Sequence, residues 1–176
     1  MENERYIILT GPVAISGTQL IIRKKRKEIL SVYPERITDR ILETDAAVLS
    51  DKAKSCILSG ETIYSAPLGR GGFFKALWDM AKELKSGFRV DMYEVPVMQE
   101  IIEICEMFDV NPYITESEGI VLVVTGSPGA QIEMFRGSGL DAGIIGRLEK
   151  GNDKKLIIGD RVRFLDRPAP DETDKF

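Results

Sequence analysis

The sequence of 176 residues contains no histidine. This absence excludes the Ser-His and Cys-His pairs of nucleophilic catalysis, zinc sites with imidazole ligands, and the general base that enzymes use most often. Any chemistry would therefore depend on carboxylates, lysines, main-chain amides, or a bound metal and nucleotide.

Cysteine is also scarce. Cys56 and Cys105 are far apart, lie in helix-like stretches and lack the spacing of metal ligands. We interpret both as buried free thiols rather than as a disulfide or a nucleophile.

The chain has neither a basic excess nor a long apolar run. Charged residues make up 30% of it, but both signs are mixed and the formal net charge is -4, which disfavours a general nucleic-acid binder. No apolar stretch approaches the length of a bilayer span. The N-terminal residues MENERYIILTG carry acids before their apolar run, unlike a signal peptide. We therefore expect a cytoplasmic protein with no nucleic-acid or membrane partner.

The sequence does contain a mixed succession of strand and helix patterns. The continuous apolar run 119–124 predicts a strand buried on both faces. Apolar residues spaced three and four apart predict an amphipathic helix over 71–84. Further strands are predicted near 5–10, 61–65, 88–91, 142–148, 156–158 and 162–165, and further helices near 17–30, 37–42, 46–57, 96–108 and 130–136. This order predicts an α+β fold, with a mixed, mainly antiparallel sheet and helices packed mainly on one face.

Three regions follow from these patterns. Residues 1–14 are expected to form an N-terminal strand or arm, and residues 15–166 the main domain. Residues 167–176 are rich in proline and acids and predict a flexible tail.

The stretch SAPLGRGGFFKALWDMAKEL, residues 65–84, places glycines directly before the predicted amphipathic helix. Free amides at a helix start and the helix dipole favour an anion, and Arg70 adds a positive charge. However, the glycines match neither a P-loop nor a dinucleotide fingerprint. On this pattern alone, a turn that packs the helix closely on the sheet is favoured, and an anion site is the alternative.

Several separated motifs resemble the C-terminal domain of the aminoimidazole ribonucleotide (AIR) synthetase superfamily, and most closely its HypE-like members. The superfamily includes selenophosphate synthetase and thiamine-monophosphate kinase. The motifs are Ile15-Ser16-Gly17, GGFFKALWDMA at 71–81, Val90-Asp91, Val95-Pro96-Val97, EIIEICE at 100–106, Asn111-Pro112-Tyr113, Glu118-Gly119, AGIIG at 142–146 and GDRVRFL at 159–165.

The resemblance implies a full-length protein about twice as long, whose N-terminal domain holds ATP and magnesium. It also implies that the glycine-rich turn lies near nucleotide phosphates, which makes Gly69, Arg70, Gly71 and Gly72 the predicted phosphate- or nucleotide-binding residues. Two departures argue against catalysis. Only about fourteen residues precede the first motif, and Ala66-Pro67-Leu68-Gly69 stands where members commonly carry Asp-x-Thr.

We therefore expect a free-standing AIR synthase-related C-terminal domain that binds a phosphate-bearing ligand or a partner and is not catalytic alone. No catalytic or metal-binding residue is assigned. ATP and magnesium would come through a separate ATP-binding subunit, and self-association into a dimer or higher oligomer would cover the surface that the missing domain leaves. One alternative is an ATP-dependent enzyme of the HypE or AIR synthetase kind, a ligase, dehydratase or phosphotransferase, acting alone or with a separate ATP-binding subunit. Its candidate magnesium ligands are Asp39, Asp45 and Asp51, which form no recognisable Asp-Asp motif. The other is a ligand-free interaction protein.

Overall fold

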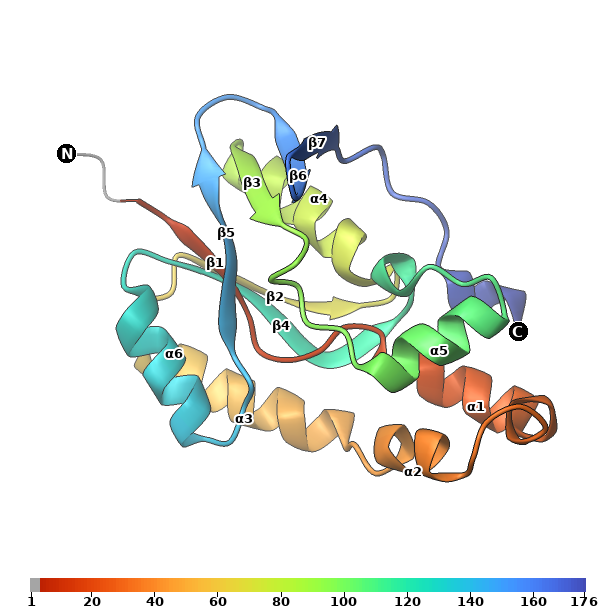
Figure 1. The fold of residues 1–176 in the computed structure, drawn as a ribbon. Helices are drawn as coiled ribbons and strands as arrows, with labels where there is room; N and C mark the ends of the chain where they lie inside the picture. Colours follow the sequence, from red (N-terminus) through yellow and green to blue (C-terminus); the bar gives the residue numbers. More distant parts are fainter. Residues whose placement is uncertain (1–3) are drawn as a thin grey trace.

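A computed structural model describes residues 4–176 and organises them around one seven-stranded sheet (Figure 1). The strand order is β2-β4-β1-β5-β3-β6-β7. Only the β3–β6 pairing is parallel within the described residues, and the other five are antiparallel. The predicted mixed, mainly antiparallel sheet is thus confirmed. The strands are β1 (Tyr6–Leu9), β2 (Tyr64–Gly69), β3 (Gly87–Asp91), β4 (Ser117–Thr125), β5 (Gly143–Glu149), β6 (Lys154–Ile158) and β7 (Arg161–Phe164).

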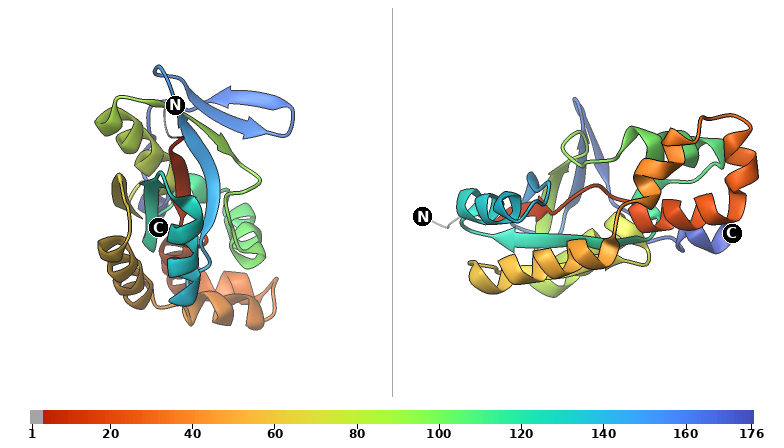
Figure 2. Two further views of the ribbon diagram at one scale, coloured as in Figure 1. Left: turned by 90° about the vertical axis from the view of Figure 1, so that its left-hand side faces the viewer. Right: turned by 90° about the horizontal axis from the view of Figure 1, so that it is seen from below.

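Helices cover the sheet unequally. The larger core includes side chains from α1, α2, α4 and α5, whereas α3 and α6 lie together over the opposite face (Figures 1 and 2). The helices are α1 (Ile15–Leu30), α2 (Arg36–Leu42), α3 (Ala46–Ser59), α4 (Gly72–Leu84), α5 (Gln99–Met107) and α6 (Pro128–Gly137), with short 3-10 helices η1 (Pro112–Ile114) and η2 (Glu172–Lys175).

Strand β4 explains how one sheet supports two cores. Side chains alternate across a strand, and the β4 residues Ile120, Leu122 and Val124 enter the larger core. Val121 and Val123 point to the other face and join the core beneath α3 and α6. A strand covered on both sides needs an unbroken apolar run, which is the pattern that the sequence presents there.

Helix α4 packs one side on the sheet next to β2. Besides Gly72, its buried residues are Phe73, Ala76, Leu77, Met80 and Ala81, at helical spacing. Lys75 and Asp79 form an ion pair on the outer side. Lys85 ends the helix in a left-handed conformation. This packing fixes the start of α4, and with it the glycine-rich turn.

Both predicted terminal segments contribute to the body of the domain. Strand β1 lies between β4 and β5 in the interior of the sheet, so the described part of the expected arm, residues 4–14, supplies an interior strand. Residues 167–176, expected to be a flexible tail, lie against the domain: Asp171 and Thr173 are buried, and the Phe176 ring meets Phe108 edge-on at 5.8 Å. The tail's acids and last aromatic ring find partners that lie far away in the sequence, which composition does not reveal.

Candidate functional site

The glycine-rich turn connects the end of β2 to the start of α4. Gly69, Gly71 and Gly72 all have positive φ, at 51°, 81° and 62°, a conformation that glycine adopts without steric cost. A Cβ on Gly72 would lie 2.4 Å from the main-chain oxygen of Thr115. Gly72 therefore lets the first turn of α4 approach the chain just before β4, as the close-packing interpretation of the pattern requires.

The predicted anion position holds one of the chain's own carboxylates. The main-chain N–H of Gly71 donates a hydrogen bond to Oδ2 of Asp171 at 2.5 Å. Oδ1 of Asp171 accepts from the N–H of Thr173 at 2.8 Å and from its hydroxyl at 2.6 Å. Arg70 forms an ion pair with Asp174. The amide and the guanidinium at this turn are both satisfied by carboxylates from the C-terminal tail.

The electrostatics of the turn follow from this arrangement. Burial opposes ionisation of Asp171, but the hydrogen bonds from Thr173 and from the Gly71 main chain outweigh it, so the pKa of Asp171 is lowered. The pKa of Glu116 is raised, first by burial and then by the nearby charges of Glu118 and Asp171. The surroundings of Arg70 are therefore rich in negative charge, and an external anion would have to replace the tail carboxylates.

Sequence reasoning did not identify Asp171 and Asp174 as part of this site. A local signal was present, because Asp171-Glu172-Thr173 has the pattern of an aspartate that caps a helical turn, as Asp171 does for η2. Folding thus places an Asp-x-Thr sequence from the C-terminal end of the chain next to the glycine-rich turn. No local pattern could reveal that contact, since 100 residues separate Gly71 from Asp171.

The weaker magnesium candidates lie elsewhere and have other roles. The side chain of Asp45 caps α3 by accepting from the N–H groups of Ala47 and Val48. Asp51 is exposed and lies 3.8 Å from Lys54, and Asp39 is exposed on α2. Within residues 4–176, no three acidic or thiol side chains are grouped so that they could hold a metal ion.

The structure also bears on the expected state of the cysteines and on the expected lack of a membrane-spanning helix. Cys56 and Cys105 are free and buried, as the sequence predicts. Over the described part of the chain, no helix combines the length and apolar character that a membrane span requires.

Known structures share this fold over nearly the whole chain but over only half of their own length. HypE from E. coli superposes with a TM-score of 0.78 at 18% identity, covering 98% of this chain and 52% of that one. A chain in the structure of the HypE–HypF complex gives 0.73 at 19%, with coverages of 96% and 54%. AaThiL, in its complex with AMPPCP and TMP, gives 0.62 at 16%, with coverages of 93% and 52%. At these identities the likeness shows the fold alone.

Comparison at the level of sequence families is more specific. Among curated proteins, no single sequence matches this chain at a significant level. Residues 4–159 match the family described as AIR synthase related protein, C-terminal domain. The match runs from β1 to the turn after β6 and includes the glycine-rich turn. The chain therefore belongs to the AIR synthase-related C-terminal domain family.

Proposed function

We propose that this domain binds a phosphate-bearing ligand at Gly69, Arg70, Gly71 and Gly72, and that it works with a second polypeptide segment rather than as a catalyst by itself. The single observation that carries the proposal is the carboxylate of Asp171 on the Gly71 amide. A buried carboxylate at the start of a 13-residue helix supports the proposal, because helix-start amides and the helix dipole attract negative charge.

The donors at the turn suit a phosphate. A main-chain amide and a guanidinium are both used for phosphate recognition, and arginine adds a bidentate geometry. Asp171 and Asp174 occupy these donors now, so phosphate and tail would compete. The ligand would bind when residues 171–174 leave the turn. The stability of the tail contact would therefore set the ligand concentration that is needed for binding.

The proposed partner follows from the extent of the match. The chain spans about half the length of the known structures that it resembles, and one of them is a complex of HypE with HypF. We propose that a segment equivalent to the other half supplies magnesium ligands and catalytic groups. ATP is the nucleotide to test first, because AaThiL was solved with the nucleotide analogue AMPPCP.

The hairpin of β6 and β7 forms one edge of the sheet and extends from the body of the domain (Figure 2). All four residues of the edge strand β7 are exposed, including Val162 at 49% and Phe164 at 59%. Tyr93 nearby in the fold is also exposed. Unpaired edges and apolar surface favour association. We propose that this surface also permits self-association, and size-exclusion chromatography with light scattering tests it: a monomer at all concentrations would contradict this part.

Calorimetric titration with inorganic phosphate, ADP and ATP tests the phosphate site. We expect the double variant Asp171→Asn, Asp174→Asn to bind more tightly than wild type, because it removes both competing charges. The control Asp141→Asn, Asp160→Asn removes the same charge from exposed positions outside the turn and should match wild type. Arg70→Ala, added to the tail variant, should weaken binding.

Two results would overturn the proposal. A folded tail variant that binds none of the three compounds would instead favour a ligand-free interaction protein. Magnesium-dependent ATP turnover by the purified chain, abolished by Arg70→Ala, would show that the chain is an enzyme in its own right.

A further inference from the structure

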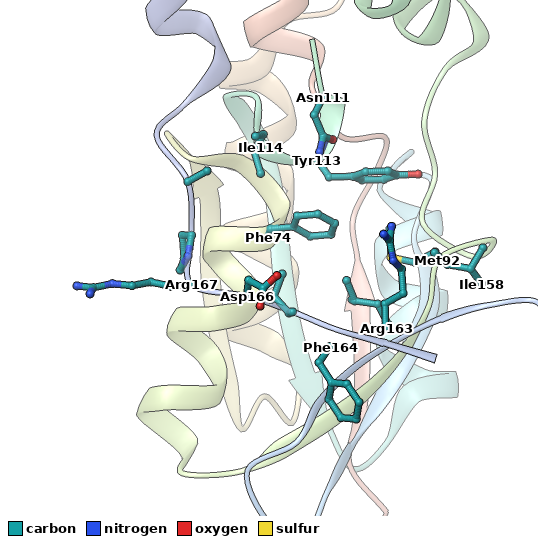
Figure 3. A pocket seen from close by; sticks show the side chains of 14 residues that line it. Phe74, Met92, Asn111, Tyr113, Ile114, Ile158, Arg163, Phe164, Asp166 and Arg167 are labelled. Atoms are coloured by element: carbon teal, nitrogen blue, oxygen red, sulfur yellow. The ribbon is translucent and has the colours of Figure 1, made fainter. Parts of the chain in front are cut away.

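A cavity of about 510 Å³ opens beside the first turn of α4, and residues 69–72 are not part of its lining (Figure 3). Its walls come from the first turn of α4, η1, the β6–β7 hairpin and the segment 165–169. The apolar part of the lining includes Phe74, Met92, Leu156 and Ile158. This volume lies within the usual range for sites that bind small organic molecules.

One wall of the cavity is a fixed set of aromatic rings. The rings of Phe74 and Tyr113 stack with their centroids 5.3 Å apart and their planes at 22°. Phe73 is fully buried behind them and contacts both rings, at 5.8 Å and 6.2 Å. The main chain of Tyr113 is held by a 2.9 Å hydrogen bond to the side chain of Asn111. The wall is therefore preformed and would lose little entropy when a flat ligand lies against it.

The rim of the same cavity carries ionisable groups without partners. Arg163, Asp166 and Arg167 line it, and within residues 4–176 none of the three has an ion pair or a side-chain hydrogen bond. Figure 3 shows the guanidinium of Arg163 extending toward the aromatic wall, whereas Arg167 points away from it. Arg163 thus offers an unused cation at the edge of an apolar, ring-lined space.

We propose that this cavity binds a small molecule that combines a flat unsaturated ring with one anionic group, a carboxylate or a phosphate. The ring would pack against Phe74 and Met92, because aromatic side chains favour stacked or edge-on ring partners. The anion would pair with Arg163, whose planar fork matches both groups. Asp166 disfavours a second anion on the ligand.

A titration monitored by nitrogen-15 NMR separates the two halves of this chemistry. The probes are phenyl phosphate, benzyl alcohol, which has the ring without the charge, and inorganic phosphate, which has the charge without the ring. We expect phenyl phosphate to bind about tenfold more tightly than benzyl alcohol or inorganic phosphate, because one charge-assisted hydrogen bond changes an affinity by about that factor. The largest shifts should fall on the amides of Phe74, Tyr113 and 163–166.

Two variants assign the roles of the residues. Arg163→Gln should weaken phenyl phosphate about tenfold and leave benzyl alcohol unchanged. Arg161→Gln, which makes the same charge change on β7 outside the lining, should bind both as wild type does. Phe74→Leu keeps an apolar side chain but removes the ring, and should weaken both ring compounds without unfolding the domain.

The proposal fails if phenyl phosphate binds no more tightly than benzyl alcohol, or if Arg161→Gln weakens it as much as Arg163→Gln. It also fails if the shifts centre on 69–72, since that result would assign the binding to the glycine-rich turn. The variants, phenyl phosphate and benzyl alcohol are not used to test the glycine-rich turn. Inorganic phosphate is common to both tests, and its site is assigned by whether its shifts fall on 69–72 or on the cavity, so either site can fail while the other stands.

Discussion

Replacing Asp171 removes the contact that joins the C-terminal tail to α4. Asp171 is only 7% exposed, and its carboxylate accepts hydrogen bonds from the Gly71 amide and from two donors of Thr173. Asparagine keeps one acceptor oxygen, so Asp171→Asn can still cap η2, but its NH₂ group then faces the remaining donor. Removing the charge and leaving one buried donor unpaired costs about 1–3 kcal/mol.

We expect Asp171→Asn to lower the free energy of unfolding by about 2 kcal/mol, and Asp171→Ala to lower it further because it removes every acceptor. For a domain of this size, about 2 kcal/mol corresponds to a fall in Tm of roughly 4–8 °C. Urea unfolding followed by fluorescence measures the change. The exposed Asp160→Asn serves as the control and should stay within about 0.5 kcal/mol of wild type.

The pH dependence gives this prediction a second, independent readout. The folded state lowers the pKa of Asp171, so its ionised form stabilises the fold above the unfolded pKa of about 3.9 and loses this effect as pH falls through the folded pKa. The difference between wild type and Asp171→Asn should be constant from about pH 5 to 8 and shrink below about pH 4. A difference under about 0.5 kcal/mol at pH 7, or one that grows as the solution is acidified, would refute the tail contact.

Three further predictions concern other contacts. Gly72→Ala should lower the free energy of unfolding by at least about 2 kcal/mol, because the new Cβ would lie 2.4 Å from a main-chain oxygen. Gly69→Ala places its Cβ in open space and should cost only about 1 kcal/mol, for its positive φ. Equal unfolding midpoints of the two variants would contradict this. Burial raises the pKa of the Cys105 thiol to about 11. At pH 8 this thiol should therefore react with a disulfide reagent at least about 100-fold more slowly in the folded than in the urea-unfolded chain. Comparable rates would show that the thiol is accessible. Lys154 lies 4.8 Å from the centre of the Trp78 ring, so Lys154→Gln should change the emission of this single tryptophan and cost up to about 1 kcal/mol, and an unchanged spectrum would argue against the contact.

Much of the fold was predictable because its signals are local. The run 119–124 became β4, buried on both faces, because an unbroken apolar strand is stable only when both sides are covered. The spacing in 71–84 became α4, since its apolar residues lie on one side. The terminal segments were harder, because the place of β1 between β4 and β5 depends on pairing across more than a hundred residues.

Part of the candidate site was likewise predictable from local sequence, and part of it was not. The local pattern was enough to place helix-start amides and Arg70 at the beginning of α4, because a helix start leaves its first N–H groups without intrahelical partners. On that pattern a close-packing turn was favoured, and an anion site was the alternative. The three-dimensional fold sets which groups meet these donors, because it brings Asp171 to Gly71 and Asp174 to Arg70. It also decided where the rings of Phe74 and Tyr113 meet Arg163 around one cavity. These contacts depend on how segments far apart in the sequence pack against each other, and a short stretch of sequence does not specify that packing.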